Sequence, residues 1–328
     1  INMKKIIALL LACVLVLSLA ACGKKDETPV EPEATPEPEI VEPVEQGPEE
    51  LDEIDKLADA ALDEKELKLI SSCGEDVTKT AAEEFEAIFG IHVTYQCMSV
   101  EDAAAAIESG SDADVWMGVP SAILDKDAAK GLFLPYTAEN SGKLLSDSFK
   151  GADGSWYGIY ADLMGFTYNR EIFADIPELI PTAWDDLYKD VYVDKLCASL
   201  TDGNAAAAVA SGEYAIAVGR VSYGVARALG GSNLDFAVPS AGLQCMVVGT
   251  AILKDCAHEN AAKQWIEFML TDFADGADLS HMGLFPVIAD AATPAIAAAL
   301  GIDIASAKVV PVTGNEGLVE LVELLKQG

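Results

Sequence analysis

The sequence predicts an α/β fold for the residues that follow position 65. Short apolar segments alternate with segments that have the spacing of amphipathic helices, as in residues 66–72, 75–90 and 91–97. Within 75–90 the apolar residues fall on one helical face, and Gly90 is a natural helix end. Strand–helix–strand repeats of this length predict a mostly parallel sheet with helices on both faces.

The next elements follow in chain order. Residues 101–109 (EDAAAAIES) are expected to form a helix and residues 113–118 (ADVWMG) a third strand. Residues 120–131 (PSAILDKDAAKG) open with proline and serine, as helices often do. The 263 residues after position 65 are enough for two modest lobes.

Two loops of this pattern are candidates for ligand contact. Sheets of this kind bind ligands beyond the carboxyl ends of their strands, where loops lead into helix N-termini. The loop 71–75 contains Ser72 and Glu75 at the spacing of a capping box, and its backbone amides could meet an anion. The loop 118–121 is the second candidate. Taken alone, each loop is explained better by ordinary helix capping.

The N-terminal segment has the features of an export signal. Two lysines precede the apolar run Ile6–Ala21, whose 16 residues are fewer than the roughly 20 of a membrane-spanning helix. A signal peptide is therefore expected over residues 1–21. The sequence Leu-Ala-Ala-Cys at its end resembles the bacterial lipobox, which predicts cleavage before Cys22 and lipidation of its sulfur. Two or more acyl chains, such as palmitate, anchor a protein stably. An ordinary secretory signal is the alternative.

Residues 22–65 are expected to be a tether that ends in a helical stalk. Residues 24–53 are rich in proline and glutamate, and such a segment stays disordered and extended because it has little apolar surface to bury. Residues 24–65 hold 16 acidic and 4 basic side chains, and the whole chain has a net charge of −33. This balance disfavours binding to nucleic acid or to acidic membrane surfaces.

The sequence predicts no metal site, no cofactor and no catalytic residue. Beyond the lipobox, five cysteines show no CxxC pair and no zinc-like spacing, and they are interpreted mainly as small buried side chains, with a disulfide as the alternative. The three histidines are too scattered to form a metal site. The signatures of serine hydrolases, zinc proteases, P-loop proteins and dinucleotide-binding enzymes are not found. The five cysteines are Cys73, Cys97, Cys197, Cys245 and Cys256.

Several stretches, taken in order, resemble a known family. The chain is similar to the extracellular solute-binding lipoproteins of bacterial ABC importers, in the branch that includes ferric-iron and aminoethylphosphonate binders. The matching stretches are ISSCGEDVTKTAAEEFEAIFGIHV, ADVWMGVPSAI, KGLFLPY, DGSWYGIYADLMGFTYNREIF, PTAWDDLY, ASGEYAIAVG and ENAAKQWIEFMLTDFADGADLSHMGLFPV. They cover most of residues 66–290. The resemblance implies a two-lobe periplasmic-binding-protein-like fold (type II), with ligand held between the lobes.

The resemblance also implies where the lobes begin and end. Lobe 1 is expected to comprise residues 66–158 and 247–328, and lobe 2 residues 163–243. The hinges are then residues 159–162 and 244–246.

The second lobe is expected to be reduced. In the family, the strand that corresponds to VDKLCASL is followed by a polar loop, a long helix and another strand. Here residues 197–200 run directly into TDGNAAAAVASGEYAIAVG. The resemblance therefore implies an internal deletion in the second lobe. Three explanations remain open: a decayed or misassembled gene, a lobe that folds in reduced form, or a different, shallower site.

Nine residues are candidate ligand contacts. Arg220 is one of only three arginines, and a guanidinium suits carboxylate or phosphate. Asp162 follows the first hinge and could pair with a cationic group. The alternatives are a lobe-core role for Tyr160, a solvated acid for Asp162 and a surface ion pair for Arg220. The full set is Ser71, Ser72, Pro120, Ser121, Tyr160, Asp162, Arg220, Ser222 and Tyr223.

The implied function is solute capture for an ABC importer by a monomer that is lipid-anchored on the extracytoplasmic face of the cell membrane. Its expected partners are a small solute and a membrane permease, and no nucleic acid. A phosphonate, phosphate ester or similar organic anion is the first choice of solute. Ferric iron is the second, because the adjacent tyrosines typical of iron binders are absent. A degenerate surface lipoprotein without a ligand is the alternative, and a lipid-anchored enzyme is less favoured.

Overall fold

The computed structural model describes residues 52–200, 203–240, 242–275, 279, 283–289, 291 and 302–327. The predicted signal peptide, the lipidation of Cys22 and the acidic tether up to residue 51 lie outside these residues. None of the helices in the described ranges has the length and apolar character needed to cross a membrane.

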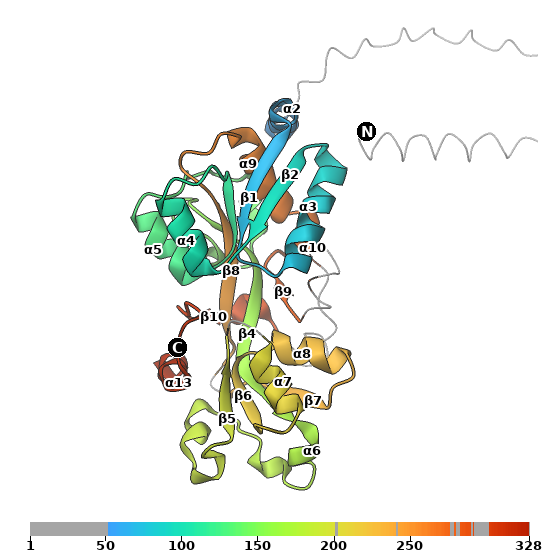
Figure 1. The fold of residues 1–328 in the computed structure, drawn as a ribbon, viewed down its shortest axis with the longest axis vertical. Helices are drawn as coiled ribbons and strands as arrows, with labels where there is room; N and C mark the ends of the chain where they lie inside the picture. Colours follow the sequence, from blue (N-terminus) through green and yellow to red (C-terminus); the bar gives the residue numbers. More distant parts are fainter. Residues whose placement is uncertain are drawn as a thin grey trace, which may run out of the picture. The chain divides into compact units, whose positions relative to one another are not determined.

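A sheet of ten strands organises the residues that the structure describes (Figure 1). Its main path runs β2-β1-β3-β8-β4-β6-β5, while β10 pairs with β8, and β7 and β9 pair with β4. The first three strands are parallel, as expected, and β8 enters antiparallel to β3. The strands are β1 (Glu66–Ser71), β2 (His92–Cys97), β3 (Val115–Pro120), β4 (Tyr157–Asn169), β5 (Leu196–Ser199), β6 (Ile216–Arg220), β7 (Leu234–Ala237), β8 (Gln244–Ile252), β9 (Phe285–Pro286) and β10 (Lys308–Val309).

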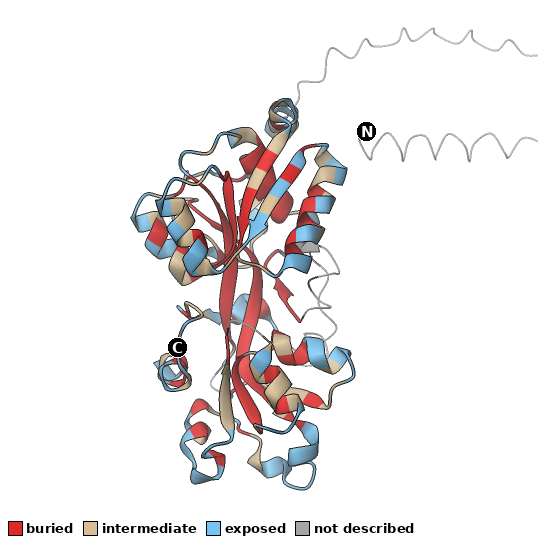
Figure 2. Cartoon of the chain, in the orientation of Figure 1, coloured by how far each residue is buried: buried red, intermediate tan, exposed pale blue. Residues whose placement is uncertain are grey.

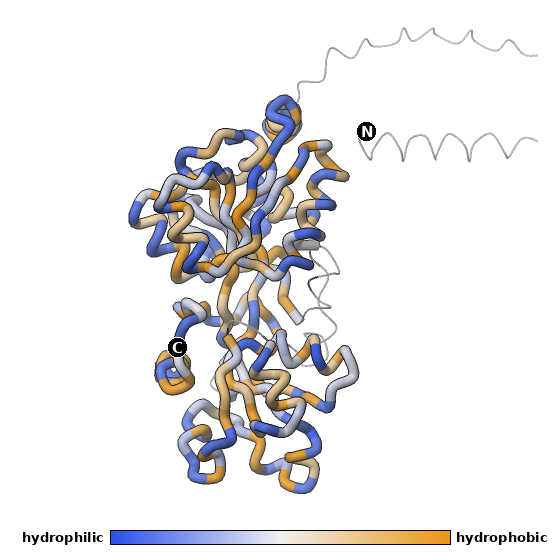
Figure 3. The backbone as a smooth tube through the Cα atoms, in the orientation of Figure 1, coloured by the Kyte–Doolittle hydropathy of each residue, from blue (hydrophilic) through white to orange (hydrophobic). Residues whose placement is uncertain are grey.

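Helices cover both faces of the first part of the sheet, which confirms the predicted α/β class. Successive residues of a strand point to opposite faces, so Val115 and Met117 enter one core and Trp116 the other. The first core includes α3 (Glu75–Phe89) and α9 (Glu259–Met269), and the second includes α4 (Val100–Glu108) and α5 (Ser121–Ala129). Figure 2 shows β4 and β8 in the middle of the sheet as buried, whereas β2 is mostly exposed. Figure 3 shows the middle strands mostly on the hydrophobic side of the scale.

One long strand belongs to both halves of the sheet. From Tyr157 to Leu163, β4 pairs with β8, and from Met164 to Asn169 it pairs with β6 and β7. The change of partner between Leu163 and Met164 is where the chain passes from the first group of elements to the second. We keep the terms lobe 1 and lobe 2 for these two groups.

Lobe 2 is built on the second half of β4 with β5, β6 and β7. Strands β5 and β6 are parallel, and β6 and β7 lie antiparallel to β4. Its helices are short. They are α6 (Arg170–Phe173), α7 (Asn204–Ala210), α8 (Ser222–Leu229) and the 3-10 helices η3 (Pro177–Leu179), η4 (Trp184–Tyr188) and η5 (Asp190–Tyr192). The other 3-10 helices of the described residues are η1 (Glu139–Lys143), η2 (Asp147–Phe149) and η6 (Ile304–Ser306).

The expected stalk is a helix, but it is part of lobe 1. Helix α2 (Glu53–Glu64) packs along α9, and Ala61 is completely buried between them. The Glu64 carboxylate accepts hydrogen bonds from the backbone N–H groups of Asn260 (3.1 Å) and Ala261 (2.8 Å), at the first turn of α9. Free N–H groups at a helix start favour a nearby anion. The sequence showed the helix but not its partner.

The C-terminal helix differs from the expected division into lobes. We expected residues 247–328 in lobe 1, whereas α13 (Leu318–Gln327) packs against η4, β5 and β6 of lobe 2. Lys326 Nζ lies 3.0 Å from Asp185 of η4, and Leu321 and Leu325 are buried. Helix α10 (Asp272–Asp275), by contrast, follows α9 directly and contacts it.

Candidate functional site

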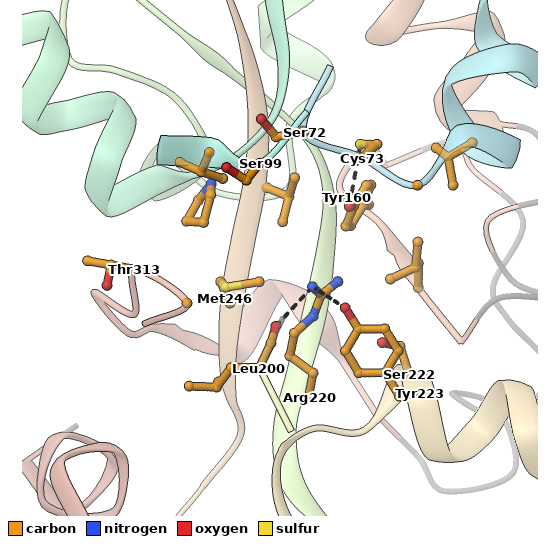
Figure 4. Close-up of a pocket in the computed structure, with 18 of the residues that line it drawn as sticks. Ser72, Cys73, Ser99, Tyr160, Leu200, Arg220, Ser222, Tyr223, Met246 and Thr313 are labelled. Carbon is orange, nitrogen blue, oxygen red and sulfur yellow. Dashed lines mark hydrogen bonds between the residues drawn. The ribbon is translucent and has the colours of Figure 1, made fainter. Parts of the chain in front are cut away.

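A cavity of about 530 Å³ lies between the elements of lobe 1 and lobe 2. Figure 4 shows side chains from both lobes pointing into it. Loops after β1, β2 and β3 line it from lobe 1, the strands β4 and β8 form its back, and β6 and α8 line it from lobe 2. The polar lining residues include Ser72, Cys73, Ser99, Glu101, Tyr160, Arg220, Ser222, Tyr223, Thr313 and Asn315.

The lobe 1 wall consists of helix starts, as the fold predicts for parallel strands. Gly74 begins α3 and Ser99 begins α4, and both line the cavity. Gly118 lies near the end of β3 with φ +85°, at an irregularity in the pairing of β3 with β8. A Cβ atom there would meet the backbone N of Cys73 at 2.3 Å, so only glycine permits β3 and the loop after β1 to approach this closely.

The predicted capping box at Ser72 is wrong. The N-cap of α3 is Gly74, which has no side chain, and the Ser72 hydroxyl instead accepts a hydrogen bond from Trp116 Nε1 (3.1 Å). Ser72 therefore holds the loop onto β3, and it also lines the cavity.

Two of the predicted contact serines do not reach the cavity. Ser71 is fully buried, its hydroxyl lies 2.7 Å from that of Thr78, and it accepts a hydrogen bond from the backbone of Cys73 (3.2 Å). Ser121 is 5% exposed at the first position of α5. Their neighbours Ser72 and Pro120 line the cavity instead.

Tyr160 lies at the back of the cavity on β4. Its hydroxyl is 3.7 Å from the sulfur of Cys73, which comes from the loop after β1 (Figure 4). Burial raises the pKa of the Tyr160 phenol well above its ordinary value of 10, and burial raises the pKa of the Cys73 thiol to about 11. Both groups are therefore neutral hydrogen-bonding groups at neutral pH.

Asp162 does not line the cavity but orients a residue that does. Its side chain is fully buried, and one of its oxygens lies 2.6 Å from Arg220 Nε. The same carboxylate accepts hydrogen bonds from the hydroxyl and the backbone N–H of Ser222. We expected Asp162 to be free for a cationic ligand group, whereas the fold already uses it for Arg220 and the start of α8.

Arg220 reaches the cavity from the end of β6. Its Nη1 donates hydrogen bonds to the Tyr223 hydroxyl (3.0 Å) and the Leu200 carbonyl (3.3 Å), and its guanidinium carbon lies 4.8 Å from the centre of the Tyr223 ring (Figure 4). Burial alone would lower its pKa, but the negative charge of Asp162 raises the pKa above the ordinary value. The side chain therefore remains cationic, and Nη2 makes no hydrogen bond with the residues that the structure describes.

Sequence reasoning missed part of the lining. Glu101 opens α4, and residues 313–315 come from a loop before α13, far from every matching stretch. The spacing of Ser99 and Asp102 is typical of a helix N-cap, and Ser99 does cap α4. This spacing could have identified the loop after β2 as a third candidate for ligand contact. Nothing in the sequence indicated that residues 313–315 return to the cavity.

The described residues hold no ready-made metal site. Within the described ranges, no group of three histidine, cysteine, aspartate or glutamate side chains is arranged to hold a metal ion. Of the two tyrosines that line the cavity, Tyr160 contacts Cys73 and Tyr223 contacts Arg220. Besides the Glu101 carboxylate, which accepts a hydrogen bond from Asn315, the lining offers hydrogen-bond donors, one guanidinium and helix starts, and these are the groups that suit an anion.

The family comparison assigns the chain to a class. The sequence model of the bacterial extracellular solute-binding protein family matches residues 74–274. The chain therefore belongs to this family, whose members bind small solutes and work with ABC permeases outside the cytoplasm. This assignment fits a binding protein rather than an enzyme.

Solved structures of similar fold include binding proteins for different solutes. The periplasmic binding protein AfuA of Actinobacillus pleuropneumoniae, with fructose-6-phosphate bound, has a TM-score of 0.64 at 18% identity, over 80% of this chain and 97% of that chain. The ferric binding protein of Campylobacter jejuni has a TM-score of 0.65 at 17% identity, over 80% of this chain and 96% of that chain. Iron-bound HitA of Pseudomonas aeruginosa has a TM-score of 0.63 at 21% identity, over 80% of this chain and 99% of that chain. No curated protein sequence matches the chain.

These likenesses confirm the predicted two-lobe, type II periplasmic-binding-protein fold. The alignments extend over nearly the full length of the solved chains. The internal deletion in lobe 2 stays a prediction, as do the exact lobe and hinge boundaries.

Proposed function

We propose that this protein captures a small organic anion between its two lobes and delivers it to an ABC permease. The single observation that carries the proposal is the placement of Arg220 at the cavity. Its guanidinium is fixed by Asp162 and Tyr223, and it faces helix starts from lobe 1. A guanidinium held in place loses little conformational freedom when it binds a carboxylate or phosphate.

A phosphonate or phosphate ester is the solute class that this chemistry favours. Tetrahedral oxyanions accept several hydrogen bonds, and the starts of α3 and α4 lie at the same cavity as Arg220. The net acidic charge of the chain does not oppose this, because the local field at a site comes from its own neighbours. AfuA, with its bound sugar phosphate, is a solved example of the fold with a phosphate ester.

Ferric iron is the second candidate, because the proteins from Campylobacter jejuni and Pseudomonas aeruginosa share the fold and are named for iron. Hard cations prefer anionic oxygen ligands. Here a ferric ion would have to displace the proton of Tyr160, whose pKa burial raises. Arg220 would add a positive charge beside the metal. Both effects favour the organic anion.

We further propose that Cys22 carries the lipid anchor and that residues 24–51 hold the binding protein at the membrane surface. The proposal rests on the lipobox-like sequence and on the proline- and glutamate-rich composition. No chemical step is needed for this function. A ligand drives closure only by binding the closed state better than the open one.

The proposed function is tested by thermal unfolding of the full chain in the presence of 2-aminoethylphosphonate, fructose 6-phosphate and ferric citrate. A ligand that binds only the folded state raises the melting temperature as its concentration increases. We expect a shift with one of the two phosphorus compounds. Arg220→Ala should weaken that binding by more than about tenfold.

The matched control is Arg227→Ala, which removes an exposed arginine of the same helix region without touching the cavity. It should leave the affinity unchanged. A shift with ferric citrate alone would favour iron. Equal affinity of the Arg220→Ala variant and the unaltered protein would remove Arg220 from the site and overturn the anion proposal.

A further inference from the structure

Residues 310–327, here called the C-terminal strap, run along the cavity and end on lobe 2. The strap begins at the end of β10, where the Val310 N–H donates to the Cys245 carbonyl of β8 (2.9 Å). Val312 is fully buried, and Thr313, Gly314 and Asn315 then line the cavity. Figure 4 shows Thr313 on the opposite side of Met246 from Arg220 and Tyr223.

The far end of the strap is fixed to lobe 2. In addition to the ion pair of Lys326 with Asp185, the Gln244 side chain donates to the Leu325 carbonyl (2.8 Å), and Tyr188 donates to Glu323. Gln244 also accepts a hydrogen bond from Trp184 of η4 (2.8 Å). The strap therefore moves with lobe 2 if the two lobes move.

The middle of the strap is shaped by its own carboxylate. Glu316 accepts hydrogen bonds from the backbone N–H groups of Thr313 (2.7 Å) and Gly314 (3.0 Å), and from the Thr313 hydroxyl (2.8 Å). This arrangement closes a tight turn, in which Gly314 has φ +99°. The turn presents Asn315 to lobe 1, where its amide donates a hydrogen bond to Glu101 at the start of α4.

We propose that the C-terminal strap is a wall of the solute cavity and that the Asn315–Glu101 hydrogen bond is a latch between the two lobes. The proposal rests on the proposed function and adds to it a pair of positioning residues. Glu101 belongs to lobe 1 and Asn315 is carried by a segment fixed to lobe 2, so the bond exists only when the lobes are close. It therefore favours the closed form before any solute arrives.

The latch predicts a specific effect on affinity. When the binding-competent conformation is only partly populated, the apparent affinity falls by that fraction. Loss of a hydrogen bond to a carboxylate at an exposed position should reduce the closed population, and with it the affinity, by about three- to tenfold. Asn315→Ala should act mainly on solute release, since it removes no donor from the Arg220 side of the cavity.

The first measurement needs no solute. Hydrogen–deuterium exchange of the full chain, without ligand, reports how often the strap opens. We expect Asn315→Ala and Glu101→Ala each to speed exchange in residues 312–317 by about three- to tenfold, and the double variant to match either single one. Gln327→Ala is the matched control, because it removes an exposed amide from the same strap outside the cavity.

The second measurement is the affinity for 2-aminoethylphosphonate and fructose 6-phosphate in the same four variants. Weaker affinity with non-additive effects supports the latch. Unchanged exchange in both single variants, or fully additive effects in the double variant, overturns it. If the unaltered protein binds neither probe, the proposed solute class fails, while the exchange data still decide whether the latch exists.

Discussion

Asp162 and Arg220 form an ion pair between β4 and β6, at the point where β4 passes from one lobe to the other. Arg220 Nε lies 2.6 Å from the carboxylate, the aspartate is fully buried, and the arginine side chain is 13% exposed. Ser222 binds the same carboxylate through its hydroxyl and its N–H. The orientation of the only cationic side chain among the described cavity residues is thus a property of the fold and does not wait for a ligand.

This pairing predicts the effect of Asp162→Asn on stability. The amide leaves the arginine without its counter-ion in a largely buried position, and breaking one partner of a buried pair costs about 3–5 kcal/mol. We expect the free energy of unfolding in urea to fall by about this amount. Asp59→Asn, an exposed position on α2, is the control and should change stability by less than about 0.5 kcal/mol. A loss below about 1 kcal/mol in Asp162→Asn would show that the pair is not important for the fold.

Cys73 and Cys97 should differ in reactivity, and Cys73 should report on the cavity that it lines. Burial raises the pKa of Cys73 to about 11, so little thiolate is present at pH 8, and the thiolate is the nucleophile. Cys97 is exposed. We expect iodoacetamide to modify Cys97 at least about tenfold faster than Cys73, as measured by mass spectrometry of the two peptides.

Bound solute should slow the modification of Cys73 further and leave Cys97 unchanged, since only Cys73 lines the cavity. Cys97 is therefore an internal control in the same molecule. If a solute slowed the modification of both cysteines equally, it would stabilise the whole fold, and Cys73 would not be part of the binding site.

Acid pH should loosen the C-terminal strap. Burial alone would raise the pKa of Glu316, but hydrogen bonds from Thr313 and Gly314 lower it below the ordinary value overall. A carboxylate with a depressed folded-state pKa stabilises the fold above its unfolded pKa, and that contribution is lost as the pH falls through the folded-state pKa. We expect exchange of strap amides, corrected for the intrinsic pH dependence, to rise below about pH 4.

The comparison that isolates this carboxylate is Glu316→Gln. This variant should exchange faster than the unaltered protein at neutral pH and should lack the acid-dependent rise. A rise of the same size in Glu316→Gln would assign the acid sensitivity to other groups.

The sequence was most informative where a local pattern and the tertiary fold agree. The three parallel strands and their helices lie within two residues of the expected bounds. This is because the periodicity of apolar residues along a strand or helix follows directly from which of its side chains face the core. Gly90 ends α3, as expected, and it has the left-handed backbone conformation. These features depend on neighbours in sequence, so a single chain reveals them.

The contact residues were harder to predict, because their roles depend on distant partners. Ser72 has the spacing of a capping residue, yet its hydroxyl accepts a hydrogen bond from the indole of Trp116, 44 residues away. Asp162 was expected to meet a ligand, and a strand that returns 58 residues later neutralises it with Arg220. The C-terminal strap was missed because β10 has only two residues and leaves no periodic signal.

The helix expected to be a stalk gives the last prediction. Glu64 of α2 accepts hydrogen bonds from the backbone of Asn260 and Ala261, and also from the Asn260 side chain (2.8 Å), so it caps α9 from a different helix. Side chains that cap a helix start contribute about 0.5–2 kcal/mol. We therefore expect Glu64→Ala to lower the free energy of unfolding in urea by about 1–2 kcal/mol.

Asp63→Ala is the matched control, because it removes the neighbouring carboxylate from an exposed position of the same helix. If residues 53–64 were a free stalk, both substitutions would lower the free energy of unfolding by an equally small amount. A loss confined to Glu64→Ala would instead mean that residues 53–64 fold as part of lobe 1 and do not form a separate stalk.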